Sequence, residues 1–214
     1  MRCLVTGATG LIGSHLIENL TADNQKVLAI VREKSSFLES FNDNCEQSVG
    51  DICDFSFIES TINNFKPDII YHLAAQSKPK LSWDNPILTH RVNVEGTHNI
   101  FMSVAQSNLD SLIVFTGSSA EYGPIKANKR IDEKHPIMPN CVYGITKASC
   151  YYLSQLYHRI ENLRVICVRP FFIIGPNVNI QTSLPGDISL IFPNCHFLLN
   201  LLTKVFSPAL PILK

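Results

Sequence analysis

The sequence predicts an α/β protein with a doubly wound parallel sheet, and three observations support this prediction. Short apolar runs alternate with segments of helical periodicity along most of the chain. The apolar runs are continuous, which is typical of strands that are buried on both faces of a parallel sheet. A glycine motif at residues 7–13 follows the first run and opens the first helical segment. Together these features favour a Rossmann-like fold.

The strands and helices are expected to alternate in chain order. The expected strands are 2–5, 26–31, 47–49, 68–72, 111–116 and 164–168, of which 47–49 is the weakest. The expected helices are 11–20, 56–65, 85–107 and 142–160. The second helix stops before Pro67, because proline cannot continue a helix. Ligands bind at the carboxyl ends of the strands in such a sheet.

The composition is that of a folded protein with a small-molecule partner. Of 214 residues, 45% are hydrophobic and 17% are charged, which argues against disorder. The 18 basic and 18 acidic residues cancel and form no long run, so neither nucleic acid nor a membrane is expected as a partner. The seven cysteines form no CxxC pair, which predicts reduced thiols and no metal site. The N-terminus enters a strand at once, so we expect no targeting segment and a cytoplasmic protein.

The alternation of strand-like and helical segments ends near residue 177. We expect residues 1–176 to form one Rossmann domain and residues 177–214 to form an irregular apolar tail. Prolines interrupt the apolar part of that tail, whereas a membrane span needs about twenty uninterrupted apolar residues. We therefore interpret residues 177–214 as an irregular, aggregation-prone segment rather than as a membrane span.

The glycine motif predicts a site for a dinucleotide diphosphate. Gly7, Gly10 and Gly13 allow a sharp turn, a close approach of phosphate and tight packing of the next helix. The helix N-terminus offers unpaired amides to the anion. A plain tight turn is the alternative reading of these glycines. Arg32 ends the second strand, where it could pair a 2′-phosphate, so we expect NADP; Glu33, or a merely solvated Arg32, leaves NAD open.

Tyr143 and Lys147 lie four residues apart on an expected helix and so share one face. A lysine ammonium near a phenol is expected to lower the pKa of the tyrosine and suit it to acid-base work. With a dihydronicotinamide present, Tyr143 would protonate the oxygen of a ketone that receives hydride. Ser118 follows a strand and could bind the same oxygen, although a turn hydroxyl is the alternative.

Five ordered motifs carry a resemblance to a known family. They are TGATGLIG at 6–13, HLAA at 72–75, Asn93, GSSAEYG at 117–123 and YGITK at 143–147. Residues 1–176 thereby resemble the extended short-chain dehydrogenase/reductases, the NAD-dependent epimerase/dehydratases of nucleotide sugars. Residues 66–75, residues 117–123 and Arg32 are most similar to the GDP-4-keto-6-deoxy-D-mannose reductases.

The resemblance implies a catalytic triad of Ser118, Tyr143 and Lys147 with Asn93 in support. The cofactor contacts that it implies are Gly7, Thr9, Gly10, Leu11, Ile12, Gly13, Arg32, Asp51, Ile52, Leu73, Ala74, Ala75, Asn93, Tyr143, Lys147 and Pro170. Helix capping by Asn93 and Asp51, and simple packing of the alanines, are the alternatives.

Three departures shape the functional hypothesis. Ala120 stands where dehydratases of the family carry an acid, and Phe172 where relatives carry a substrate-binding asparagine. The third departure, which the resemblance implies, is that most of the C-terminal substrate lobe is expected to be missing. The resemblance therefore implies reduction of a 4-keto-6-deoxy GDP-sugar with Tyr143 as proton donor. Nucleotide-sugar 4-epimerisation and a non-catalytic cofactor-binding remnant that acts through a partner are the alternatives. The resemblance also implies a homodimer, with the helix after Tyr143 as the candidate contact.

Overall fold

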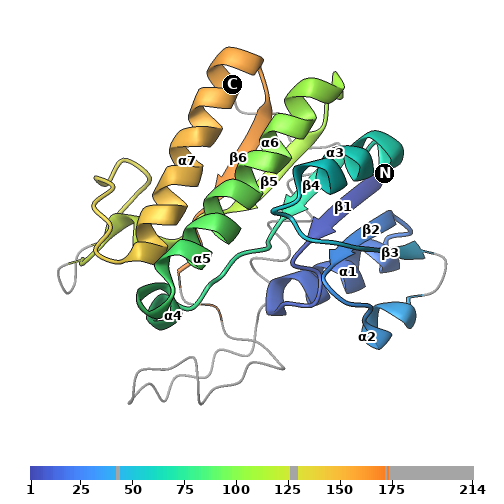
Figure 1. Ribbon diagram of the computed structural model, residues 1–214, viewed down its shortest axis with the longest axis horizontal. Helices are drawn as coiled ribbons and strands as arrows, with labels where there is room; N and C mark the ends of the chain where they lie inside the picture. Colours follow the sequence, from blue (N-terminus) through green and yellow to red (C-terminus); the bar gives the residue numbers. More distant parts are fainter. Residues whose placement is uncertain (42–43, 126–129, 172, 174–214) are drawn as a thin grey trace.

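The structure of the protein is a computed structural model that describes residues 1–41, 44–125, 130–171 and 173. In this part of the chain, six parallel strands form one sheet in the order β3-β2-β1-β4-β5-β6 (Figure 1). The strands are β1 (Arg2–Thr6), β2 (Lys26–Val31), β3 (Cys45–Val49), β4 (Ile69–His72), β5 (Leu112–Thr116) and β6 (Arg164–Val168). The predicted doubly wound sheet is confirmed, including the weak third strand.

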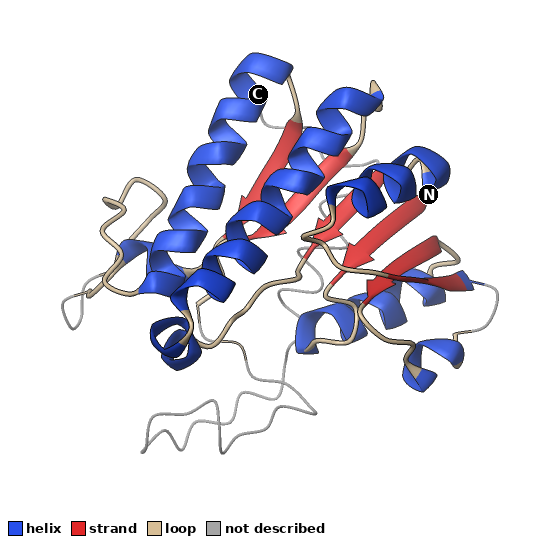
Figure 2. Cartoon of the chain, viewed as in Figure 1, coloured by secondary structure: helices blue, strands red, loops and turns tan. Residues whose placement is uncertain are grey.

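Helices cover both faces of this sheet (Figure 2). The longer ones are α1 (Leu11–Ala22), α3 (Phe55–Phe65), α6 (Gly96–Ser107) and α7 (Val142–Glu161). Alternate residues of a strand point to opposite faces, and β1 shows the result. Cys3 and Val5 join the buried cluster that contains Leu16 of α1. Leu4 joins the other cluster, which contains Ile58 of α3 and Ile100 of α6. The core therefore has two layers, one on each side of the sheet.

The predicted helix at 85–107 is helical but not regular. It consists of α5 (Pro86–His90), the π-helical turn η2 (Arg91–Glu95) and α6. Within η2, the carbonyl oxygen of Asn93 accepts the hydroxyl of Thr97 at 2.6 Å and the thiol of Cys150 on α7 at 3.1 Å. These two side chains are hydrogen-bonded to the Asn93 carbonyl oxygen within the π-helical turn. Such π turns occur often at functional sites.

Three short elements were not predicted from the sequence. They are α2 (Ser36–Glu39), α4 (Pro79–Asp84) and the 3₁₀ turn η3 (Ser119–Tyr122). Each is too short to show a helical period. The expected tail at 177–214, and with it the proposed division near residue 176, lies outside the described residues. Of the helices that the structure describes, none has the length and apolar character needed to cross a membrane.

The direction of the strand order reverses at β1, which fixes where a ligand can bind. Cys3 of β1 pairs with Val27 of β2 on one side and with Ile69 of β4 on the other. The connections that follow β1 and β4 therefore run to opposite faces of the sheet. Parallel α/β sheets bind ligands in the crevice that this divergence opens at the carboxyl ends of the strands.

Candidate active site

A cavity of about 720 Å³ lies at the carboxyl ends of the strands. The predicted site residues that line it are Gly7, Thr9, Gly10, Leu11, Ile12, Gly13, Arg32, Asp51, Ile52, Leu73, Ala74, Ala75, Ser118, Tyr143, Lys147 and Pro170. The structure therefore brings together all but one of the predicted residues, although they come from seven separate regions of the chain. Asn93 is the exception.

The glycine loop leaves a bare cradle at the start of α1. Gly7 has φ +68°, and a Cβ there would lie 2.7 Å from the backbone nitrogen of Ala74. A Cβ on Gly13 would overlap the carbonyl oxygen of Gly7. Gly10 is the N-cap of α1 and contributes no side-chain cap, and no acidic residue lies in the first turn. Unoccupied amides at the positive end of a helix dipole fit the diphosphate of a dinucleotide.

A chain of hydrogen bonds beneath the cavity fixes this loop. The Ala74 amide donates to the hydroxyl of Thr6 at 3.1 Å, and that hydroxyl lies 2.8 Å from Nδ1 of His72. Nε2 of His72 lies 2.9 Å from the hydroxyl of Thr97, which itself donates to the carbonyl of Asn93. Nε2 must therefore donate and Nδ1 must accept. Burial lowers the pKa of His72 from 6.5 to about 3, so the ring is neutral and every partner is satisfied.

Arg32 and Asp51 lie at the adenosine end of the predicted cofactor site. Arg32 follows β2, is exposed, and forms no ion pair with another described residue. Glu33 is also exposed but does not line the cavity. The Asp51 carboxylate accepts the amide of Cys53 at 2.9 Å. Asp51 therefore makes a local turn bond and lines the cavity, whereas the helix cap that was its alternative reading belongs to Asp54.

Ser118, Tyr143 and Lys147 converge at the other end of the cavity. Ser118 ends the loop after β5 and lines the cavity together with Tyr143, and hydrogen bonding by its hydroxyl acts to lower the pKa of the phenol. Lys147 is buried, and its Nζ donates to the carbonyl oxygen of Thr116 at 2.7 Å. The same Nζ lies 6.0 Å from the centroid of the Tyr143 ring. A proton donor, a hydroxyl and a cation thus line one cavity.

The expected direction of the Tyr143 pKa is wrong for this structure. Burial raises the pKa of the phenol above 10.0, and the hydrogen bond from Ser118 only partly opposes this rise. Burial also lowers the pKa of Lys147 below 10.5, with the negative charge of Glu121 among the effects that oppose it. Since Lys147 is directed to Thr116, the phenol stays protonated at neutral pH.

Asn93 lies outside the cavity lining, and its expected cofactor contact stays a prediction. Its side chain is buried and clamps the backbone of Gln76, accepting the amide at 2.7 Å and donating to the carbonyl at 3.1 Å. It also donates to the hydroxyl of Thr146 on α7 at 2.9 Å. Asn93 therefore joins the cavity loop at Gln76 to the helix that carries Tyr143 and Lys147.

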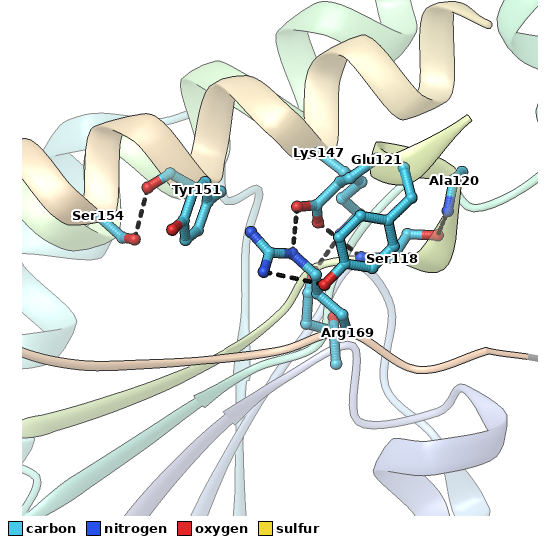
Figure 3. A network of polar contacts seen from close by, with 9 residues as sticks. Ser118, Ala120, Glu121, Lys147, Tyr151, Ser154 and Arg169 are labelled. Carbon is cyan, nitrogen blue, oxygen red and sulfur yellow. Dashed lines mark hydrogen bonds and ion pairs between the residues drawn. The ribbon is translucent and has the colours of Figure 1, made fainter. Parts of the chain in front are cut away.

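Some residues at the site were not predicted. Thr116 and Gln76 line the cavity and contact predicted residues through backbone groups, which leave no sequence signal. Glu121 and Arg169 form an ion pair behind Ser118 (Figure 3). Ala120 stands at the position of the family's dehydratase acid, and the neighbouring Glu121 is fully buried in this ion pair. Within the described residues, no cluster of His, Cys, Asp or Glu is arranged to hold a metal, and the six described cysteines are free.

Comparison with known proteins identifies relatives that are similar to this chain in sequence. A human dTDP-D-glucose 4,6-dehydratase is 29% identical over 90% of this chain and 57% of its own length. A GDP-6-deoxy-D-talose 4-dehydrogenase of Aggregatibacter actinomycetemcomitans is 31% identical over 88% of this chain and 58% of its own length. The chain thus spans little more than half the length of these relatives.

A crystal structure supports the same relationship. The UDP-glucose 4-epimerase of Thermus thermophilus, solved in complex with NAD, is 28% identical and superposes with a TM-score of 0.73, over 79% of this chain and 54% of that one. A family profile described as GDP-mannose 4,6 dehydratase matches residues 4–190, which is most of the chain. The glycine loop, the convergent triad and this match lead to one conclusion: the chain belongs to the GDP-mannose 4,6 dehydratase family, among the NAD-dependent epimerases and dehydratases that its motifs resemble.

Proposed function

We propose that the chain carries the cofactor site and the proton donor of an NADPH-dependent oxidoreductase that reduces the 4-keto group of a GDP-linked 4-keto-6-deoxy sugar. The observation that carries this proposal is that Ser118, Tyr143 and Lys147 line the same cavity as the bare glycine loop. A bound dihydronicotinamide supplies hydride. The residues of the chain supply the proton, the orientation of the ketone and the exclusion of water.

Each member of the triad has a role that follows from its contacts. Tyr143 donates its phenolic proton to the ketone oxygen, which becomes the sugar hydroxyl. Its raised pKa keeps the proton on the phenol at neutral pH and so favours the direction of reduction. The Ser118 hydroxyl, which lines the same cavity as that phenol, orients the same oxygen. Lys147, held by Thr116, is placed to bind a ribose hydroxyl of the cofactor.

Two observations favour reduction over dehydration. Elimination of water needs a base, and Ala120 cannot supply one. The nearest acid, Glu121, is fully buried with Arg169 and so is not free to reach a substrate. The relative named GDP-6-deoxy-D-talose 4-dehydrogenase also supports this choice, because a 4-dehydrogenase acting in reverse reduces a 4-keto group.

The cofactor preference rests on Arg32. Arg32 lines the cavity and has no ion-pair partner among the described residues, whereas a carboxylate in its place would accept a hydrogen bond from a free ribose hydroxyl. The NAD complex of the Thermus epimerase keeps NAD as the alternative. A larger rise in melting temperature with NADPH than with NADH would support the assignment, since a ligand stabilises the state that binds it. An absence of any rise would contradict the cofactor site.

A turnover assay separates the candidate functions. Purified protein is mixed with NADPH and GDP-4-keto-6-deoxymannose, and NADPH absorbance is followed. A reductase consumes NADPH, whereas a 4-epimerase of UDP-glucose, the activity named for the Thermus relative, interconverts sugars without net consumption. A cofactor-binding remnant shows the melting shift alone, and that result would overturn the reductase proposal for this chain.

We also propose that two copies pair through α7. This helix leaves Ile145, Tyr152, Leu156 and Ile160 exposed at helical spacing, and an apolar stripe of this kind fits a second helix. Sedimentation equilibrium should give a dimer for the parent chain and a monomer for Tyr152→Glu/Leu156→Glu. A monomeric parent would contradict the proposal.

A further inference from the structure

A buried ion pair lies behind the triad, outside the cavity lining. Nε of Arg169, just after β6, donates to Oε2 of Glu121 at 2.6 Å. Glu121 is fully buried, and the Arg169 side chain is only 10% exposed. The guanidinium carbon lies 4.0 Å from the centroid of the Tyr151 ring and 5.2 Å from that of Tyr122 (Figure 3). The pair is therefore held in one geometry by stacking as well as by charge.

The second oxygen of Glu121 reaches the triad. Oε1 accepts the backbone amide of Ser118 at 2.7 Å, while the Ser118 hydroxyl accepts the amide of Ala120 at 3.1 Å. These two bonds form a capping box at the start of η3. Ser118 and Tyr143 line the same cavity. A series of hydrogen bonds thus runs from Arg169 through Glu121 to Ser118, which lies in the cavity with the proton donor.

The Glu121 carboxylate leaves no room for a side chain at residue 117. A Cβ at this position would overlap Oε1 of Glu121 and lie 2.9 Å from the sulfur of Cys167. The Gly117 amide donates to the carbonyl of Val168 at 2.8 Å, and the Ser119 amide donates to the carbonyl of Pro170 at 3.0 Å. The loop after β5 is therefore joined to the end of β6 on both sides of Ser118.

We propose that Glu121 and Arg169 are positioning residues that hold Ser118 against Tyr143. Stability alone does not explain the pair, since a buried ion pair can often be replaced by apolar side chains without loss of stability. What an apolar replacement removes is the acceptor for the Ser118 amide. The consequence for catalysis rests on the proposed function, whereas the consequence for the position of Ser118 does not.

The test variant replaces both charges with apolar side chains of similar size, Glu121→Leu/Arg169→Met. Removing one charge alone would leave the other buried and unpaired, and such a variant is expected to unfold. The matched control, Asp110→Leu/Arg164→Met, removes an exposed ion pair of 3.2 Å at the opposite end of β5 and β6. Melting temperature, NADPH affinity and steady-state kinetics are measured for the parent and both variants.

We expect the test variant to fold, to bind NADPH within about threefold of the parent, and to lose about 10- to 100-fold in kcat. Ser118→Ala should then cost much less in the test variant than in the parent, because both changes act through one hydroxyl. Parental kcat in the test variant, or the same cost of Ser118→Ala in both backgrounds, would overturn the proposal.

Crystal structures of the parent and the test variant, without substrate, give a measurement that does not depend on turnover. The Ser118 hydroxyl should lie within hydrogen-bond distance of the Tyr143 phenol in the parent and should leave it in the test variant. A hydroxyl that stays in place would overturn the positioning role. A parent that shows the expected geometry but no turnover would count against the proposed function alone.

Discussion

The buried ring of His72 should make the stability of the fold depend on pH. The ring is 3% exposed, and its pKa falls from 6.5 to about 3 on folding. A depressed folded pKa contributes stability that is complete above the unfolded pKa and is lost as the pH falls from 6.5 toward 3. Between pH 7.5 and pH 5.0 the unfolded chain takes up this proton and the folded one does not, which removes about 2 kcal/mol from the free energy of unfolding.

Urea unfolding followed by far-ultraviolet circular dichroism measures this effect. His72→Gln keeps one acceptor and one donor for Thr6 and Thr97 but does not titrate. Between pH 7.5 and pH 5.0, the free energy of unfolding of the parent should fall by about 2 kcal/mol more than that of His72→Gln. The contributions of the carboxylates are the same in both proteins and cancel in this difference. The exposed His90→Gln is the control and should behave as the parent does. Equal losses in the parent and His72→Gln would refute the neutral, buried ring.

Three further predictions concern the cavity. Tyr143→Phe should lower kcat by about 10²- to 10⁴-fold without changing the melting shift on NADPH, and parental turnover would exclude Tyr143 as proton donor. Gly13→Ala should lower the melting temperature and abolish the melting shift on NADPH, because its methyl group overlaps the Gly7 carbonyl oxygen. The control is Gly10→Ala, whose methyl group meets that oxygen only at 3.2 Å. Equal melting temperatures of the two variants would contradict the bare glycine loop. Arg32→Ser should weaken NADPH binding, measured by calorimetry, by about tenfold, or ~1.5 kcal/mol, and should leave NADH binding unchanged. An equal loss of affinity for both cofactors would show that Arg32 does not bind a 2′-phosphate.

Local patterns in the sequence predict most of the fold. The strand at the start of the chain, the glycines after it and the period of Leu16 and Leu20 all lie within a few neighbouring residues. Tyr143 and Lys147 share a helix face for the same reason. Once the strands are parallel, their carboxyl ends meet at one edge, so motifs far apart in the chain come to line one cavity.

The features that sequence reasoning missed depend on distant partners. The π turn at Asn93 is bonded to Cys150, and nothing within residues 85–107 indicates that contact. The pKa of Tyr143 rises through burial, which is a property of the assembled cavity rather than of the spacing to Lys147. Arg169 and Glu121 are 48 residues apart, and only the neighbouring positions of β5 and β6 bring them together.

The space that Gly117 leaves for the Glu121 carboxylate links the choice of amino acid at these two positions. A side chain at 117 would displace the carboxylate and would also lie 2.9 Å from the sulfur of Cys167. Glycine at 117 and an acid at 121 should therefore be retained together. A library that randomises both positions, selected for a stable fold, should return glycine with an acid, because an uncharged residue at 121 would leave Arg169 buried without its partner.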